Sequence, residues 1–532
     1  DRNSSRLISA PYSLYLFKSV SQLAPTFTPD EFLWESIVPG KELVWHDDQI
    51  LGAPNQVHYS HFLCGQIPLD YSNPDAASAA ISMTRIHSIV PHNSSEYRGS
   101  ILINPGGPGG SGVDMVQIWG ANISTIVGPE FDVIGFDPRG ISRSIPRVSF
   151  FESRSQREVW LKSPDNLHAL SMNAPTDTLP RAWAQGIIER QLAGERDDGN
   201  LRFINTAHTA RDMLRIVQAH GREKLQYWGF SCVVVKPAQF TSPLIQDPAM
   251  EDNVERLVID GVADSENYFA TEWSNNLVDT EKTWGTFVDG CVAAGPQGCA
   301  FLSPIATELE ANIDKIYSSL RVSPIPVRTN TSFGVVDYSM MRSVIFRSLY
   351  SPYAKFPVLA GPSPAFKCGC DPSEFRGTAV RCNDGKRMPS SYQDVIEHYQ
   401  NTSKLSRWAD VWQAGRLACA HRTCPRRNWT TELLILILYS AKKMSQGFAG
   451  SVVLAQDSAG HCKKYVRGYF LNGTLPEPGI VCPVISSPLP THDYRAPADA
   501  QVALARSAGD HKLLEAVTEL AKTFDFPFLG GL

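Results

Sequence analysis

Leu225-Gln226-Tyr227-Trp228-Gly229-Phe230-Ser231 joins a short apolar run to a Gly-x-Ser triplet. An apolar run of this length that ends in turn residues is typical of a buried parallel strand, so we predict a strand from Leu225 to Trp228. Gly-x-Ser directly after such a strand is typical of a sharp turn into a helix, which lifts the serine hydroxyl above the sheet. Ser231 is therefore a candidate nucleophile. Alone, the triplet is a weak signal, because serine follows glycine in many loops.

Further apolar runs on both sides of this strand predict the rest of a sheet. Between two of them, Thr206 to His220 places Ala210, Met213, Leu214 and Val217 on one face at helical spacing, which predicts a crossover helix. Strands joined by helices predict an α/β fold with a mostly parallel sheet, whose chemistry lies at the carboxyl ends of the strands. The other predicted strands are Ile101 to Ile103, Phe131 to Phe136, Leu257 to Ile259, Leu433 to Leu438 and Val452 to Leu454.

A glycine-rich run follows the first of these strands: Asn104-Pro105-Gly106-Gly107-Pro108-Gly109-Gly110-Ser111-Gly112. Because glycines have no side chain, backbone N–H groups in such a run can approach a developing oxyanion. We assign Gly106 and Gly107 to an oxyanion hole, together with the backbone N–H of Cys232 after the nucleophile. Two other interpretations remain: a plain turn, or a phosphate-binding loop, although the Lys-Ser/Thr of such loops does not follow.

Two more motifs follow predicted strands. Asp137-Pro138-Arg139-Gly140 follows Phe131 to Phe136, where it either braces the floor of the site or forms a surface turn, and we favour bracing. Asp457-Ser458-Ala459-Gly460-His461 follows Val452 to Leu454, late in the chain, where a hydrolase of this fold carries its histidine. His461 is the candidate general base, although an isolated loop histidine is more often simply solvated.

These motifs together resemble the proline iminopeptidase and tripeptidyl aminopeptidase branch of the α/β-hydrolases. The resemblance runs from about Phe32 onward and is strongest with secreted fungal and actinobacterial members. It implies an α/β-hydrolase fold with an inserted, mainly helical cap, and an enzyme that releases residues or short peptides from substrate amino termini. It also implies no metal and no organic cofactor. The residues that carry it are the glycine-rich run, Phe131 to Pro146, Tyr227 to Ser231, Val254 to Asp264 and Gly447 to Cys482.

The sequence departs from this family at two sites of chemistry. After Ser231 the family continues Tyr-Gly-Thr into a helix, whereas here Cys232-Val233-Val234-Val235-Lys236-Pro237 favours strand and then breaks a helix. The family also has its acid in a loop that here reads Tyr439-Ser440-Ala441, with no carboxylate. Asp260 and Asp264 are candidate substitute acids, with a turn residue and a helix cap as their simpler interpretations. Such abrupt departures suggest errors in the gene model.

Composition limits the class of partner and the compartment. Charged residues make up 19% of the 532 residues and the formal net charge is -5, without the basic face that nucleic acid requires. No apolar run approaches the roughly 20 residues of a membrane span. Eleven cysteines favour a secreted, disulfide-bonded glycoprotein. So do seven glycosylation sequons, at Asn3, Asn93, Asn122, Asn330, Asn401, Asn428 and Asn472.

From about Ser265 to Cys424 the chain shows helical and Pro/Gly-rich stretches without regular strand spacing, which predicts a cap. The resemblance suggests the remaining domain organisation and the cysteine pairs. We expect an uncertain extension at 1–30, a first part of the core at 31–264, a cap at 265–424, and a second part of the core with the tripeptidyl-aminopeptidase-like region at 425–532. The implied pairs are Cys291 with Cys299 and Cys382 with Cys419, while Cys482 ties down the tail. The odd number of cysteines leaves at least one thiol unpaired, for which Cys232 is a candidate. No second feature supports Cys232 as a nucleophile.

Three functions remain in competition. The favoured one is a serine aminopeptidase that acts on peptide amino termini through an acyl-enzyme. The second is a hydrolase of small esters or amides in a biosynthetic pathway, because the fold and the nucleophile turn do not define the substrate. The third is a catalytically impaired protein, which the altered turn and the missing acid loop favour.

Overall fold

The computed structural model describes residues 45–48, 59–161, 178–231, 253–301, 303–328, 333–361, 374–388, 391–419, 441, 451–456, 462–482, 488–489 and 508–523. In these ranges, seven strands form one sheet in the order β1-β2-β3-β5-β4-β6-β7. β1, β2, β3 and β5 pair antiparallel, and β5, β4, β6 and β7 pair parallel. The strands are β1 His46–Asp48, β2 Tyr59–Pro68, β3 Ser78–Ile86, β4 Gly99–Asn104, β5 Phe131–Phe136, β6 Leu225–Phe230 and β7 Val254–Asp260.

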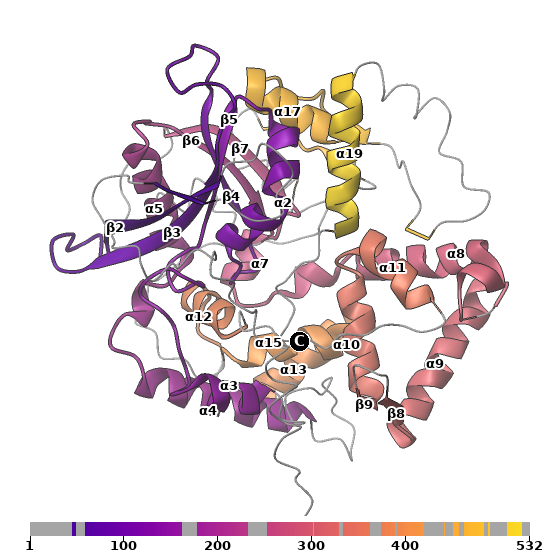
Figure 1. The fold of residues 1–532 in the computed structure, drawn as a ribbon. Coiled ribbons are helices and arrows are strands. Elements are labelled where there is room, and N and C mark those ends of the chain that lie inside the picture. The colour runs from indigo at the N-terminus through magenta and orange to yellow at the C-terminus, as the bar shows by residue number, and fades with distance from the viewer. Residues whose placement is uncertain are drawn as a thin grey trace, which may run out of the picture.

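Helices cover both faces of the sheet, as Figure 1 shows. Successive side chains of β4 point to opposite faces of the sheet and so belong to two separate apolar clusters. Ile101 and Ile103 face α2, whereas Leu102 faces α5, and all three are fully buried. α17 and α19 lie on the α2 side, where Phe470 and Val517 complete the same apolar cluster. The bounds are α2 Gly112–Val127, α5 Thr206–Ala219, α17 Lys463–Asn472 and α19 Ala508–Thr523. This is the architecture of an α/β-hydrolase fold.

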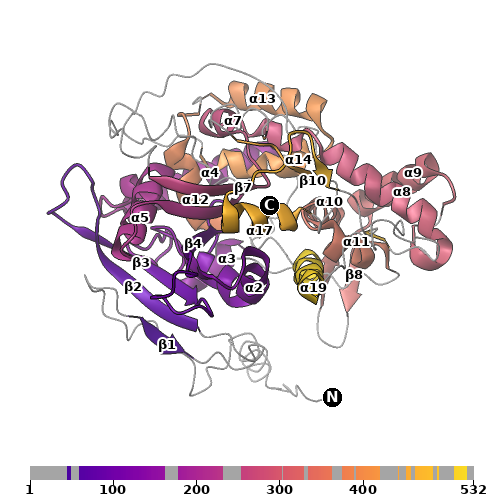
Figure 2. The same cartoon turned by 90° about the horizontal axis from the view of Figure 1, so that it is seen from above.

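The chain between β7 and α17 is mainly helical where it is described, and it lies beside the carboxyl ends of the parallel strands (Figures 1 and 2). Its own apolar core includes Phe287, Phe346, Phe356 and Trp408. A short hairpin, β8 Ile325–Arg328 with β9 Phe333–Val336, interrupts the helices. The helices are α7 Ser265–Phe269, α8 Thr280–Gly298, α9 Ala306–Val322, α10 Tyr338–Ser348, α11 Pro352–Ala360, α12 Glu374–Asp384, α13 Tyr392–Leu405, α14 Ala409–Trp412 and α15 Ala414–Leu417, with a 3-10 turn at Ser274–Leu277.

Two helices that precede Ser231 in the chain lie with this helical layer. α3 (Arg154–Leu161) and α4 (Thr178–Glu195) run along its lower edge in Figure 1, and a 3-10 turn at Leu201–Phe203 leads back to α5. Leu179 of α4 packs in one cluster with Val395 of α13 and Leu417 of α15. The helical layer therefore contains segments from before and after β6 in the sequence. α4 lies within the predicted first part of the core (31–264), whereas α13 and α15 lie within the predicted cap (265–424).

Most predicted elements that fall in the described ranges are confirmed. β4, β5, β6 and β7 contain the predicted runs, and α5 matches the predicted crossover helix. The strand predicted at Val452 to Leu454 is wrong in position, because β10 comprises Ala455–Gln456 and pairs in parallel with β11, Val481–Cys482. The disulfide of Cys482 with Cys462 ties β11 to the start of α17. Leu433 to Leu438 lies outside the described residues. None of the described helices has the length and apolar character needed to cross a bilayer.

Candidate active site

Ser231 stands directly after β6, in a backbone conformation that few side chains adopt. Its φ is +61°, in the left-handed region, where a residue other than glycine stores strain of roughly 1 to 3 kcal/mol. Its backbone N–H donates to the carbonyl oxygen of Asp260 at 2.8 Å, so β7 supports this conformation. A strained serine after a parallel strand is the geometry expected of a nucleophile turn. Residues 232–252, which include Cys232, lie outside the described residues.

The glycine-rich run lies against this turn. Gly106 has φ +84°, and a methyl group on it would overlap the carbonyl oxygen of Phe230 and come within 2.8 Å of the Cβ of Ser231. Only glycine fits there, so the run and the serine are packed as a unit. The Gly106 N–H donates to Oδ1 of Asn104 at 2.9 Å. Because this N–H is already bonded to a side chain, it is not available to an oxyanion. Of the two predicted donors in the run, Gly107 therefore remains.

A helix of the layer between β7 and α17 touches the same run. A methyl group on Gly377 of α12 would overlap the carbonyl oxygen of Pro108 and lie 3.6 Å from the Cα of Gly109. α12 therefore packs directly on the loop, at a distance that only a glycine permits. Because α12 also carries Cys382, whose disulfide with Cys419 joins it to the end of α15, the loop is attached to the helical layer.

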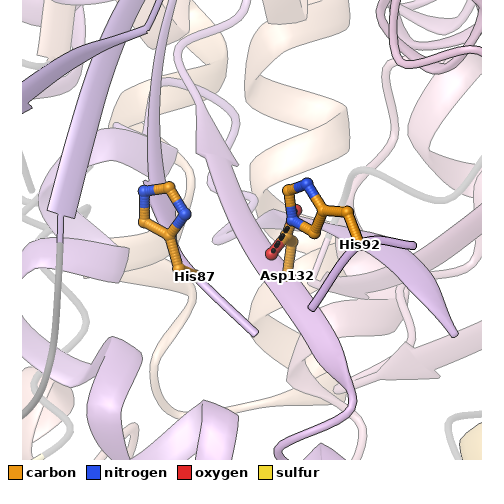
Figure 3. A group of neighbouring side chains, drawn as sticks. All are labelled: His87, His92 and Asp132. Carbon is orange, nitrogen blue, oxygen red and sulfur yellow. Dashed lines mark hydrogen bonds and ion pairs between the residues drawn. The ribbon is translucent and has the colours of Figure 1, made fainter. Parts of the chain in front are cut away.

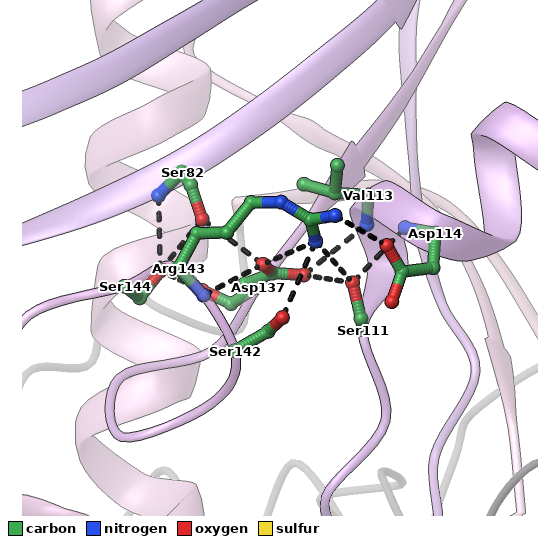
Figure 4. Close-up of polar contacts among 8 residues, drawn as sticks. All are labelled: Ser82, Ser111, Val113, Asp114, Asp137, Ser142, Arg143 and Ser144. Carbon is green, nitrogen blue, oxygen red and sulfur yellow. Dashed lines mark hydrogen bonds and ion pairs between the residues drawn. The ribbon is translucent and has the colours of Figure 1, made fainter. Parts of the chain in front are cut away.

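A buried carboxylate fastens the glycine-rich run to the sheet (Figure 4). Asp137 accepts hydrogen bonds from Ser111 Oγ at 2.5 Å and Ser82 Oγ at 3.1 Å. Arg143 lies 3.5 Å from Asp137 and pairs with Asp114 of α2 at 2.7 Å. Burial raises the pKa of the Asp137 carboxyl, and the charge of Arg143 opposes this shift. Asp137 thus links the end of β5 to Ser111, which caps α2.

Arg139 from the same motif is fully buried and makes a two-point ion pair with Asp212 of α5. Its Nε donates to Oδ2 at 2.7 Å and its Nη2 to Oδ1 at 2.5 Å. It also donates to the carbonyl oxygens of Pro68 and Leu69. Asp137-Pro138-Arg139-Gly140 therefore braces β2, β5 and α5, which confirms the structural interpretation over a surface turn.

The two candidate acids lie in different surroundings. Asp264 is the N-cap of α7, where its carboxylate accepts the N–H of Glu266 at 3.0 Å and of Asn267 at 3.2 Å. Asp260 ends β7, and its Oδ2 accepts from Nζ of Lys463 at 2.6 Å. Asp264 therefore has the helix-capping role that was its simpler interpretation. Asp260 is one-third exposed, at 34% of its side chain, and is engaged by a lysine that sequence reasoning did not identify.

His461 lies outside the described residues, but the chain resumes at the next residue. Cys462 forms a disulfide with Cys482, and Lys463 begins α17. The two other disulfides in the described ranges, Cys291–Cys299 and Cys382–Cys419, are the pairs that the family resemblance implies. The residue after His461 is therefore attached at a defined position, on the α2 side of the sheet.

A second polar cluster (Figure 3) includes Asp132 near the start of β5, at the opposite end of this strand from the glycine-rich run. His87, His92 and Asp132 bring their ligand atoms within 4.8 Å of one another, a donor set that a zinc ion can use. The guanidinium of Arg85, however, is 3.6 Å from Asp132 and 3.5 Å from Nε2 of His87. Tyr97 Oη also donates to Asp132 at 3.0 Å. The protein's own cation thus neutralises this buried carboxylate, so we interpret the cluster as structural.

Sequence comparison links this geometry to known proteins. The chain is 25% identical to a tripeptidyl aminopeptidase of Streptomyces lividans over 490 residues, which is 82% of each sequence. It is 28% identical to the serine protease Hip1 of Mycobacterium tuberculosis over 233 residues, 40% of this chain and 42% of the relative. It is 31% identical to Carboxylesterase B of Mycobacterium tuberculosis over 154 residues, 29% and 28%. No protein-family model matches. With hydrolases as its relatives, a strained serine after β6 and a glycine-rich run against it, the chain is a serine hydrolase.

Proposed function

We propose that the protein is an aminopeptidase that releases residues or short peptides from the amino termini of peptides through an acyl-enzyme. The observation that carries the acyl-enzyme part of this proposal is the contact of Gly106 with Phe230 and Ser231, because it places the glycine-rich run directly against a strained serine. A relative that spans most of the chain, the tripeptidyl aminopeptidase of Streptomyces lividans, supports the substrate class.

In the proposed reaction, Ser231 Oγ attacks the scissile carbonyl while His461 takes its proton. The backbone N–H groups of Gly107 and Cys232 would stabilise the oxyanion, whereas that of Gly106 donates to Asn104. The C–N bond then breaks, and His461 gives its proton to the departing amine. Water, deprotonated by His461, next attacks the acyl carbon and releases Ser231 with its proton.

A labelling experiment and a substrate panel test this function. The purified protein is expected to react with a fluorophosphonate probe and to cleave aminoacyl or tripeptidyl chromogenic amides. Acetylation of the substrate amino terminus should abolish cleavage, because an aminopeptidase requires the free terminus. Ser231→Ala should remove both labelling and turnover, and a loss of turnover of less than about tenfold would remove Ser231 from the nucleophile role.

A second candidate is a hydrolase of small esters or amides. The 31% identity to Carboxylesterase B over 154 residues favours this alternative. An enzyme of this kind would cleave nitrophenyl esters, and cleavage of peptide amides would be absent or independent of a free amino terminus. A protein that neither labels nor turns over any of these substrates would correspond to the catalytically impaired alternative.

We also propose an extracellular location. Three disulfides support it, because such bonds persist in oxidising compartments. Three of the sequon asparagines, Asn93, Asn401 and Asn472, are exposed and therefore accessible to glycosylation. Protein secreted from a eukaryotic host should lose mass after treatment with an N-glycosidase. An unchanged mass would contradict the glycoprotein part of this proposal.

A further inference from the structure

Lys463 connects the start of α17 to Asp260, the last residue of β7. It is the first residue of α17 and stands two positions after His461 in the sequence. Its Nζ donates to Oδ2 of Asp260 at 2.6 Å, and its side chain is only 10% exposed. The ammonium also lies 4.8 Å from the ring centre of Trp228 in β6. A nearly buried ammonium is unfavourable without a partner, so this pair fixes the start of α17.

Asp260 is also bonded to the nucleophile through its backbone. Its carbonyl oxygen accepts the N–H of Ser231 at 2.8 Å, while its carboxylate holds Lys463. One residue therefore connects the strained turn at Ser231 with the helix that follows His461 in the chain. On the other side of this helix start, Cys462 is bound to Cys482. Two attachments, one ionic and one covalent, thus hold consecutive residues next to His461.

We propose that Lys463 is a positioning residue, which acts through Asp260 to hold the chain that follows His461 at the carboxyl end of β7, beside Ser231. The proposal rests on the proposed function insofar as it gives His461 a catalytic role. It also changes the role of Asp260. The Asp260 carboxylate already accepts a short hydrogen bond from the Lys463 ammonium, so we assign it an anchoring role. Because the ammonium neutralises its negative charge, Asp260 would stabilise a protonated His461 only weakly.

Four variants test the anchor. Lys463→Met removes the charge and keeps a similar length, Lys463→Arg keeps the charge, Asp260→Asn removes the partner, and the double variant Lys463→Met/Asp260→Asn removes both. Lys464→Met is the matched control, because Lys464 is the neighbouring lysine of the same helix and is exposed. Each variant is first compared with wild type by thermal unfolding. Asp260→Asn and Lys463→Arg keep the test available if Lys463→Met does not fold.

The first measurement does not depend on activity. Amide hydrogen exchange of the peptide at 463–472, in which the N–H groups of Tyr465 and Val466 donate to the carbonyl oxygen of Cys462, should become about tenfold faster in Lys463→Met and in Asp260→Asn, because this end of α17 opens more easily. The double variant should exchange no faster than either single variant, since both remove the same bond. Lys463→Arg and Lys464→Met should exchange like wild type. Wild-type exchange in Lys463→Met would overturn the proposal.

The second measurement is the rate of Ser231 labelling by the fluorophosphonate probe, with kcat and KM on a tripeptidyl amide. Lys463→Met and Asp260→Asn should each lower the labelling rate and kcat by about tenfold to 100-fold with KM nearly unchanged, as expected for a misplaced base. A loss of about 10⁴-fold in Asp260→Asn with no loss in Lys463→Met would overturn the proposal and make Asp260 the acid. If exchange becomes faster in Lys463→Met and Asp260→Asn but the wild-type protein does not react with the probe, the anchor stands and only the proposed function is contradicted.

Discussion

Gly106 lies so close to Ser231 that a single methyl group on it would come within 2.8 Å of the serine Cβ and overlap the carbonyl oxygen of Phe230. The two segments are 125 positions apart in the chain, yet each defines the position of the other. The nucleophile turn is therefore one wall of the oxyanion loop, and the geometry of both depends on the absence of one side chain.

Gly106→Ala should consequently lower kcat by more than about 100-fold, because displacing the loop moves both the oxyanion donors and the nucleophile. The measurement is kcat and fluorophosphonate labelling on protein whose circular dichroism matches wild type. Gly199→Ala is the matched control: Gly199 has φ +89°, close to the +84° of Gly106, but no atom lies within 4 Å of the position of its methyl group. Equal losses in both variants would attribute the effect to backbone strain instead of contact.

Gly377→Ala tests whether α12 seats the loop. Its methyl group would overlap the carbonyl oxygen of Pro108, so α12 must move away from the loop. We expect a lower melting temperature and a raised KM, because the helical layer would no longer pack on the oxyanion loop. Gly285→Ala in α8 is the control, since its methyl group would meet no atom within 4 Å and glycine-to-alanine changes at such helical sites stabilise by about 0.4 to 1 kcal/mol. A stabilised Gly377→Ala protein would contradict the contact.

Local patterns predicted the parallel part of the sheet because its strands are short apolar runs bounded by turns. β3 escaped prediction for a physical reason: it buries Ser82, Thr84 and Arg85, which look solvent-facing in the sequence. Ser82 is satisfied by Asp137, 55 positions away, and this partner exists only in the folded chain. Because buried polar residues with distant partners interrupt the apolar pattern, the hydrophobic periodicity of the sequence does not reveal this strand.

The candidate site shows the same limit. Gly-x-Ser and the glycine-rich run predicted which segments meet, because each motif implies a backbone conformation. Lys463 had no such signal, since its partner Asp260 lies 203 positions earlier. The helix-capping role of Asp264, in contrast, depends on the next three residues alone, and it was foreseeable from the sequence as an alternative to catalysis.

Arg139→Met should destabilise the fold by about 3 to 5 kcal/mol, because it leaves Asp212 buried without its ion-pair partner. Burial already raises the pKa of Asp212, and the charge of Arg139 opposes this shift. The measurement is urea unfolding at pH 7. Lys282→Met is the control, since the pair of Lys282 with Asp279 at 2.7 Å is exposed and should contribute less than about 1 kcal/mol. Losses of similar size in both variants would contradict a special role for the buried pair.

Asp384 predicts a pH dependence of stability. This last residue of α12 is buried and accepts hydrogen bonds from the backbone N–H and the hydroxyl of Thr206, at the start of α5, and from Tyr268 Oη. Burial raises the pKa of Asp384 to about 6 from 3.8. The folded protein therefore keeps this proton over a range in which the unfolded chain has lost it.

The sign follows from proton linkage. Between about pH 4 and pH 6 the unfolded chain binds fewer protons at Asp384 than the folded protein, so the free energy of unfolding falls as pH rises and then stays level above about 6. The difference between 3.8 and about 6 corresponds to about 3 kcal/mol.

Asp384→Asn lacks this titration, so its stability relative to wild type should rise by up to that amount from pH 4 to pH 6 in urea unfolding. Asp314→Asn, an exposed site on α9, should follow the wild-type curve. A constant difference between Asp384→Asn and wild type across this range would show that only hydrogen bonding, and not desolvation of the carboxylate, determines the role of Asp384 at the contact of α12 with α5.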